Sequence, residues 1–587
     1  MIRLLLVGLP GADWATLPRR LAGLPFLRGL VERGVAGPLR CPPPLGDGPA
    51  PWAALATGRH AEAHGVLLPT EVRPDGGGLR PASARSWRAA PLWSQLEAAG
   101  LRAGVVAWPA AAPAVAWPGL HVDASFAAAT GRDAQGWALP RRCVTPELRG
   151  ALRDLRLHPT EIDAETPAGF VPGMAQVDQA RDTALAELAV LVAEAATVHA
   201  AATWLAEHRA PDALMVHYGW LARLVARFEG AAPPLDGVVA AAWRFQDAML
   251  ARLAALAGPG AAVVVVAPAG PGQGLLAATG PGIAGDSLLH GAGVLDVAPT
   301  LLARFGLADE EAPGRVLPEI APRGPANPAP APPCLPPEPD NEAAVRALAA
   351  QGYPDTPDRD ALLAQQAAHL AALAVALLPR DPGAAERAAE AALGLSPDSP
   401  GPLATLALAK VALGDAEALR PLGERLRRAA PDRCWGALAL GAHHALRGEA
   451  ELAAPFLGAA EAAGEANVLL RVGAAWLVLA RSADAERVMA AALALDPLLA
   501  EAATGLGLAR HMAGDLPGAE AALRRALVLD HAPPLPRLYL GAVLLDAGRL
   551  GEAAAMLDAA ERVGADRATV AGLRRALAVR IAVTLPQ

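Results

Sequence analysis

Three side chains among the first 64 residues have the chemistry of a catalytic site. Asp13 follows a Gly-rich turn, Asp47 stands between Gly46 and Gly48, and His64 precedes a glycine. Carboxylate oxygen and imidazole nitrogen bind zinc-like ions, and a carboxylate can also act as a nucleophile. Each residue also has a simpler interpretation, as a helix cap for Asp13 and as turn residues for the other two, and we favour it. A metal-dependent site that uses all three stays open as an alternative, and it requires them to converge in space.

The element that would position such a site is a short apolar strand at residues 2–7. It has no polar face, which suits a central strand of a parallel sheet covered on both sides. It leaves through GLPGADW, Gly8 to Trp14. A tight turn at the carboxyl end of a parallel strand is where an open α/β sheet places its chemistry. Pro10, which stands in this turn, offers no side-chain lone pair, charge or N–H.

Residues 1–321 alternate β-rich runs with helical stretches, which predicts an α/β domain with a mainly parallel sheet and helices on both faces. The predicted strands are Arg3–Val7, Gly104–Trp108, Ala213–His217, Ala262–Val266 and Leu275–Ala278. The predicted helices are Leu24–Arg33, Leu92–Ala99, Gln176–Glu207 and Ala240–Leu256. His217, at the end of a strand, is expected to be half-buried with its hydrogen bonds satisfied.

The C-terminal part is predicted to be an all-α repeat array. A Pro-rich stretch, 322–340, forms a semi-rigid linker, and connecting helices occupy 341–365. Small residues then recur at intervals of 34 residues, as at Gly473, Gly507 and Gly541, and alanines follow each at fixed offsets. This pattern resembles the tetratricopeptide repeat (TPR), in which small residues let paired helices approach closely. We expect about six units over 366–567 and a capping helix at 568–587, with an irregular Ala-rich bundle as the alternative.

Several segments of the N-terminal domain, in order, resemble the alkaline phosphatase superfamily, in particular its type I phosphodiesterase/nucleotide pyrophosphatase branch. They include GLPGADW, the first helix with its following strand at 24–39, PWAALATGRHAEAHGV at 51–66, RLHPTEI at 156–162, GPGI at 280–283 and DVAPTLLARFGL at 296–307. The resemblance implies hydrolysis of phosphate or sulfate esters with two metal ions, usually zinc, and a Ser or Thr nucleophile.

The same resemblance places the family's functional positions on residues that cannot perform this chemistry. The nucleophile falls on Gly48, and the metal-ligand positions fall on Pro10, Ala222, Ala226, Pro268 and Ala269. The loop that should supply a last histidine is PGQG, residues 271–274. This loop contains no histidine, and the side chains of Pro, Ala and Gly can neither bind a metal nor act as a nucleophile. We therefore expect no cofactor and interpret the domain as a catalytically inactive pseudoenzyme. The alternative is an active metal-dependent hydrolase with a site rebuilt from Asp13, Asp47 and His64.

Composition and charge argue against several other classes of protein. The chain has 587 residues and a formal net charge of −8, which argues against a nucleic-acid-binding face. No uncharged apolar stretch reaches the roughly 18 residues of a membrane span, and LLLV is too short for a signal peptide, so we expect a cytoplasmic protein. Its four cysteines, Cys41, Cys143, Cys334 and Cys434, are scattered and predict thiols instead of disulfides.

The leading functional hypothesis is a protein-interaction scaffold. The first helix of each repeat would line a groove for a protein or peptide partner, with Trp435, Thr504, Leu508 and His511 as candidate contacts. A non-hydrolytic sensor of a phosphorylated ligand or nucleotide is a further alternative.

Overall fold

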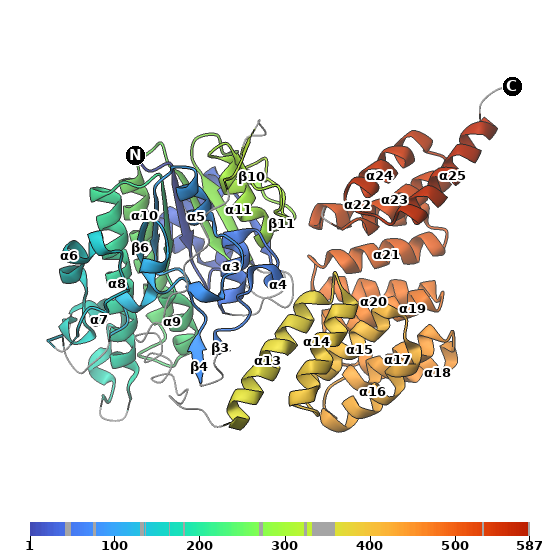
Figure 1. Ribbon diagram of the computed structural model, residues 1–587, viewed down its shortest axis with the longest axis horizontal. Helices are drawn as coiled ribbons and strands as arrows, with labels where there is room; N and C mark the ends of the chain where they lie inside the picture. The colour runs from blue at the N-terminus through green and yellow to red at the C-terminus, as the bar shows by residue number, and fades with distance from the viewer. Residues whose placement is uncertain are drawn as a thin grey trace. The chain divides into compact units, whose positions relative to one another are not determined.

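The computed structural model describes residues 1–41, 48–73, 78–129, 134–135, 137–163, 165–179, 182–268, 274–321, 326–330, 359–530 and 533–584. The chain divides into two compact units, Met1–Gln365 and Gln366–Gln587 (Figure 1). Asp47, Ala269, Cys334 and most of the predicted linker and connecting segment lie outside the described residues.

The first unit is built on a mainly parallel sheet, as predicted. Its strands follow the order β10-β2-β9-β8-β1-β7-β5-β6, with β11 beside β2. Their bounds are β1 Leu4–Gly8, β2 Val35–Arg40, β5 Ala103–Val106, β6 Leu120–Val122, β7 Ala213–His217, β8 Ala262–Ala267, β9 Gly274–Thr279, β10 Ser287–Leu288 and β11 Ala292–Gly293. Strand β1 lies between β7 and β8, is parallel to both, and is buried along its whole length. Strand β9 is antiparallel to both β8 and β2.

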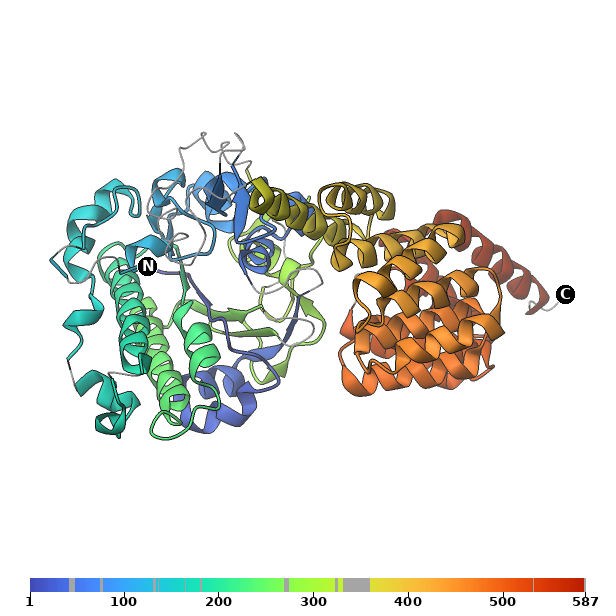
Figure 2. The ribbon, with the colours of Figure 1, turned by 90° about the horizontal axis from the view of Figure 1, so that it is seen from below.

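Helices cover both faces of the sheet (Figures 1 and 2). One face carries α2 (Pro25–Arg33), α8 (Ala184–His208), α9 (Trp220–Phe228) and α10 (Val238–Ala257). The other carries α3 (Pro49–Thr57), α5 (Leu92–Ala98) and α11 (Val294–Ala303). The shorter elements of this unit include α1 Leu17–Arg20, α4 Ala61–His64, β3 Thr70–Val72, β4 Leu79–Pro81, α6 Arg149–Leu152, α7 Glu165–Phe170, β12 Leu307–Ala308 and β13 Asn327–Pro328.

Helix α8 begins later than the sequence pattern predicts. The predicted start at Gln176 falls instead in a 3₁₀ turn, Met174–Gln176. The Asp182 carboxylate accepts a hydrogen bond from the backbone N–H of Ala184 (2.8 Å) and so favours a helix start at that residue. Within the described residues, α8 and α13 (Arg359–Leu377) are long and apolar enough to cross a membrane by length and composition alone. Helix α8 packs into the core of the first unit through residues such as Leu188 and Val192.

The described residues 359–584 form six helix pairs and a last helix, which is a TPR solenoid. The pairs are α13 with α14 (Pro382–Leu395), α15 (Pro400–Leu413) with α16 (Ala416–Ala429), α17 (Trp435–Leu446) with α18 (Ala450–Glu461), α19 (Ala466–Val478) with α20 (Ser482–Leu495), α21 (Ala500–Met512) with α22 (Leu516–Leu529), and α23 (Leu535–Asp546) with α24 (Leu550–Arg562); α25 is Arg567–Thr584.

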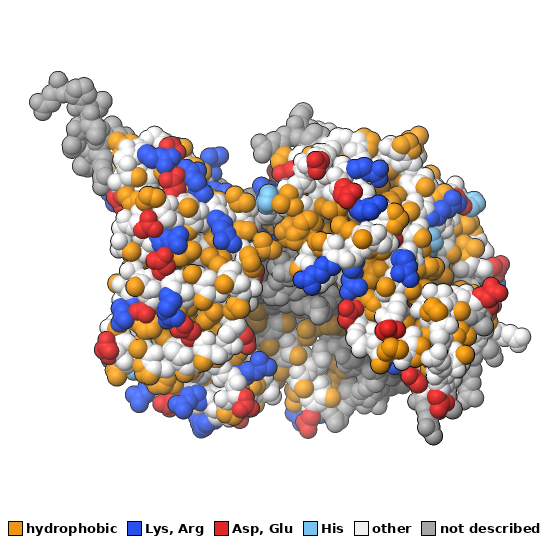
Figure 3. Space-filling model, turned by 180° about the vertical axis from the view of Figure 1, so that it is seen from behind, with side chains coloured by type: hydrophobic (Ala, Val, Ile, Leu, Met, Phe, Trp, Pro, Cys, Tyr) orange, Lys and Arg blue, Asp and Glu red, His pale blue; other side chains and the backbone are white. Residues whose placement is uncertain are grey.

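Small residues allow the helices of each pair to pack closely, as the spacing predicts. An added Cβ at Gly441, Gly473, Gly507 or Gly541 would lie 2.5–3.0 Å from a Leu or Met side chain of the second helix. The alanines that follow at fixed offsets, Ala485, Ala519 and Ala553 among them, are fully buried. Ion pairs such as Arg549–Glu520 (2.7 Å) connect successive units, and Figure 3 shows both signs of charge interspersed on one face of the array.

Candidate functional site

The position predicted for chemistry is the edge of the sheet where β1, β7 and β8 reach their carboxyl ends; we call it the carboxyl edge. The register aligns Gly8 of β1 with His217 of β7 and Val266 of β8. Pro10 and Pro268 each lie within two residues of these strand ends. Side chains that follow aligned parallel strands meet at one edge, so the strand topology gives this edge the geometry that a site requires.

The structure brings two of the predicted positions together. An added Cβ at Gly11 would lie 3.2 Å from the Cα of Ala222, so the turn that contains Pro10 lies against the first turn of α9. Ala226 is one turn further along α9 and is exposed, whereas Pro268 is buried at the end of β8. None of these four side chains carries a nitrogen, oxygen or sulfur atom, so the residues at these positions do not fit a metal ion.

Gly48 lies at the start of α3 and is exposed. Its φ of 139° belongs to a region that L-residues with a side chain rarely adopt. A serine or threonine nucleophile at this position would therefore require the backbone to change. The local fold is matched to the glycine and not to the hydroxyl that the family resemblance implies.

An aromatic cluster fills the space beside the strand ends. The Trp52 indole, on α3, lies 4.5 Å from the His217 ring and 5.7 Å from the Trp108 ring, both edge-on. An added Cβ at Gly8 would be only 2.7 Å from Cζ3 of Trp52, so the indole packs directly on bare backbone. The cluster continues from Trp108 to Trp93 at 5.9 Å. The carboxyl edge is thus packed with rings, which the sequence analysis did not predict.

His217 departs from its prediction. Its side chain is half-buried, as expected, but its Nε2 has no hydrogen-bond partner in the described part of the chain. Burial lowers the pKa of His217 to about 3, and the charge of Arg223 acts in the same direction. The imidazole is therefore neutral at physiological pH and serves as an aromatic packing surface for Trp52.

Asp13 and His64, the two residues of the alternative, rebuilt site that the structure describes, have hydrogen-bond partners. The Asp13 carboxylate accepts hydrogen bonds from the backbone N–H (2.8 Å) and the hydroxyl of Thr16, which is itself the N-cap residue of α1. Asp13 therefore stabilises the turn before this helix and is not the predicted helix cap. His64 is buried, its Nδ1 accepts a hydrogen bond from the backbone N–H of Val66 (3.2 Å), and burial lowers its pKa to about 3. Among the described residues, no group of three His, Cys, Asp or Glu side chains could hold a metal ion.

The candidate contacts of the repeat array lie on the first helices of their pairs, Trp435 on α17 and the other three on α21, and their side chains differ in how buried they are. Trp435 is half-buried and packs against two neighbouring core clusters. Thr504 donates its hydroxyl to the carbonyl of Ala500 (2.9 Å). His511 pairs through Nε2 with Asp546 of the next repeat (2.9 Å). Leu508 is half-buried and lies between Thr504 and His511 on one face of α21.

A comparison of the sequence with known protein families agrees with this fold. Residues 4–273 match the family described as type I phosphodiesterase / nucleotide pyrophosphatase. These residues form a domain of that family. The domain carries the family's framework, and its carboxyl edge corresponds to the position that the sequence resemblance gave to the reaction. We refer to it below as the phosphodiesterase domain.

Solved structures resemble the repeat array at low overall similarity. PilF of Pseudomonas aeruginosa is 19% identical over 30% of this chain and 86% of its own, with a TM-score of 0.26. A thermophilic TPR protein of Thermus thermophilus is 24% identical over 37% of this chain and 99% of its own, with a TM-score of 0.25. A chain of the Cut9–Hcn1 complex is 18% identical over 40% of this chain and 48% of its own, with a TM-score of 0.31. No curated protein matches the chain. The repeat fold therefore rests on the helix pairs described above.

Proposed function

We propose that this protein is a non-catalytic scaffold, in which a pseudoenzyme phosphodiesterase domain accompanies a TPR array that binds protein or peptide partners. The observation that carries the proposal is the composition of the carboxyl edge. The family framework is present, yet Pro10, Gly48, Ala222 and Pro268 supply neither a nucleophile nor a metal ligand. Such a site has no means of activating a nucleophile or stabilising the charge of a transferring phosphoryl group.

Hydrolysis and metal content test the first half of the proposal. We expect the purified full-length chain, supplied with Zn²⁺, Mn²⁺ or Mg²⁺, to hydrolyse bis(4-nitrophenyl) phosphate at the uncatalysed rate, whereas enzymes accelerate reactions by about 10⁶-fold or more. We also expect far less than one zinc ion per chain by mass spectrometry. Stoichiometric zinc together with hydrolysis that a chelator abolishes would contradict the proposal. In that case, loss of activity in Asp13→Asn and His64→Gln would assign it to the rebuilt site.

The interaction surface is the exposed face of the first helices. Val478 of α19 and Met512 of α21 occupy equivalent positions, 34 residues apart, and are 57% and 43% exposed. Met512 lies one helical turn beyond Leu508, on the face that also carries His511. Exposed apolar side chains repeated at equivalent positions of consecutive units offer a continuous surface to a partner.

Paired charge substitutions test this surface. We expect a Val478→Glu/Met512→Glu double variant of the full chain to lose the proteins that the unaltered chain captures from a lysate of its own organism. A matched control, Leu495→Glu/Val528→Glu, places the same charges on second helices at residues that are 56% and 52% exposed, and it should retain them. Capture that persists in the first variant would show that these first-helix residues are not the binding surface.

A further inference from the structure

A pocket of the phosphodiesterase domain lies at the opposite end of the sheet from the carboxyl edge. It has a volume of about 560 Å³ and is formed where β5 and β6 begin. Arg102 directly precedes β5, Leu120 opens β6, and Arg209 follows the end of α8. The volume is within the range of about 300–1,000 Å³ that is usual for small-molecule sites. No functional position predicted from the sequence falls in this pocket.

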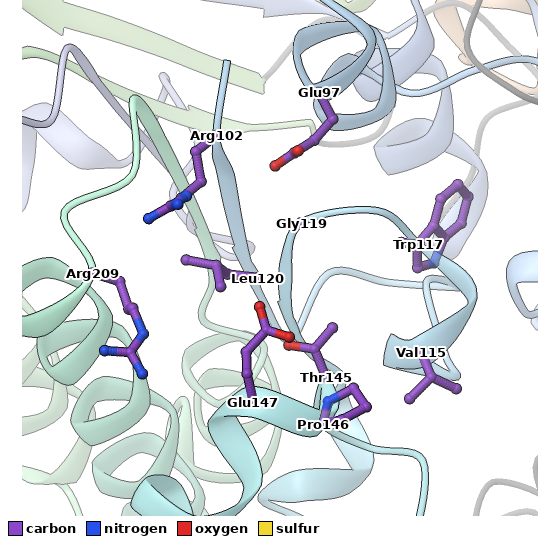
Figure 4. Close-up of a pocket in the computed structure, with 10 residues that line it drawn as sticks. All are labelled: Glu97, Arg102, Val115, Trp117, Gly119, Leu120, Thr145, Pro146, Glu147 and Arg209. Atoms are coloured by element: carbon purple, nitrogen blue, oxygen red, sulfur yellow. The ribbon is translucent and has the colours of Figure 1, made fainter. Parts of the chain in front are cut away.

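Four charged side chains from three segments surround the pocket (Figure 4). Arg102 and Arg209 contribute two guanidinium groups, and Glu97 and Glu147 contribute two carboxylates. In the described part of the chain, neither the Arg102 guanidinium nor the Glu147 carboxylate has a hydrogen bond or an ion pair, and both residues are exposed. The pocket therefore offers free charge of both signs within one space.

The position of Glu97 is set by the backbone around it. Its Oε1 accepts a hydrogen bond from the N–H of Ala103 at 2.6 Å. An added Cβ at Gly119 would lie 2.4 Å from this oxygen, so the glycine leaves room for the carboxylate. Burial raises the pKa of Glu97, the hydrogen bond from Ala103 and the charge of Arg102 oppose this rise, and the charge of Glu147 adds to it. The two carboxylates thus influence each other electrostatically and together favour a cation.

An apolar surface completes the pocket. Trp117 and Leu120 line it, and the Trp117 indole is held in place by a hydrogen bond from Nε1 to the carbonyl of Ala111 (2.6 Å). Figure 4 shows Trp117 on the opposite side of the pocket from the two arginines. Trp117 is only 4% exposed, whereas Val115 is half-buried and Pro146 is exposed. A ligand with a hydrocarbon part could therefore place it against Val115 and Pro146 while its charged groups meet the four ionic side chains.

We propose that this pocket binds a small zwitterion of amino-acid type, with a carboxylate, an ammonium group and an apolar side chain. A purely anionic ligand would meet repulsion from Glu97 and Glu147, and a purely cationic one would meet repulsion from Arg102 and Arg209. A zwitterion satisfies both pairs, with the carboxylate toward the guanidinium groups and the ammonium toward the carboxylates. The proposal is independent of whether the carboxyl edge is catalytic.

Calorimetric titration of the full-length chain tests this proposal with matched probes. We expect L-leucine or L-phenylalanine to bind with a Kd of about 1 mM or tighter. The leucine analogues 3-methylbutylamine and 4-methylpentanoate, which each lack one charge, should bind about tenfold more weakly. Absence of binding for every apolar amino acid at about 10 mM, or equal binding of a single-charge analogue, would overturn the proposal.

Substitutions locate the binding in the pocket. Arg102→Gln and Glu147→Gln change exposed side chains, and each should weaken binding about tenfold without altering the circular dichroism spectrum. Arg244→Gln and Glu310→Gln make the same chemical changes at exposed residues outside the pocket and should leave the Kd unchanged. Equal weakening in all four variants, or in none, would place the binding elsewhere and overturn the assignment.

Discussion

Replacing Trp52 with alanine is expected to destabilise the phosphodiesterase domain by about 3–5 kcal/mol, the usual cost of truncating a buried aromatic side chain. The indole is 5% exposed and lies against the bare backbone of Gly8 and the rings of His217 and Trp108. These neighbours belong to strand β1, the end of β7 and the segment after β5, which the sheet holds in place. They cannot collapse far into the space that the indole leaves, so much of the cavity should persist.

Urea unfolding followed by intrinsic fluorescence measures this loss selectively. Ten of the twelve tryptophans belong to the first unit, because only Trp435 and Trp476 lie in the repeats. The matched control is Trp204→Ala. Trp204 is half-buried on α8, where its ring stacks on His208 at 4.8 Å and meets the Arg209 guanidinium at 4.9 Å. We expect that variant to lose less than about 1.5 kcal/mol, and similar losses in both would contradict the special role given to Trp52.

The parts of the fold that the sequence predicted are those whose cause is local. The runs that became β1, β7 and β8 are continuous stretches of Leu, Val, Ala and Met, and a strand buried on both faces needs no other signal. The direction of β9 was not predictable in this way. Its apolar run reads the same in either direction, so the residues of the strand do not indicate its antiparallel pairing with β8 and β2.

The candidate site likewise has features that the sequence could predict and features that it could not. The predicted nucleophile position at Gly48 and the predicted ligand positions at Pro10, Ala222 and Pro268 were taken from segments contiguous in sequence, so their side-chain types could be read directly. The aromatic cluster combines Trp52, Trp108 and His217 from three distant segments, and the charged pocket also combines residues from three. No spacing rule connects such residues. Trp52 belongs to the segment at 51–66 that resembles the family, but the sequence does not show which residues across the sheet it contacts.

In the repeat array, by contrast, residues at a fixed spacing in the sequence contact each other between paired helices. A substitution at such a contact has the second large expected effect. Gly507→Ala should destabilise the array by about 1–3 kcal/mol, although alanine favours helix over glycine by about 1 kcal/mol. The new Cβ would lie 2.6 Å from Cγ and 2.9 Å from Cδ2 of Leu523, and 3.2 Å from the carbonyl oxygen of Ala519. Leu523 and Ala519 are fully buried, so α21 and α22 would have to separate.

Gly458→Ala is the control that isolates this contact. Gly458 lies inside α18, is exposed, and has no atom within 4 Å of an added Cβ. Only helix propensity acts there, so this variant should gain up to about 1 kcal/mol. The two identical substitutions should therefore shift the thermal unfolding of the array in opposite directions. Stabilisation by both would mean that the paired helices can separate without cost, and that the small residue at this repeat position does not hold the units together.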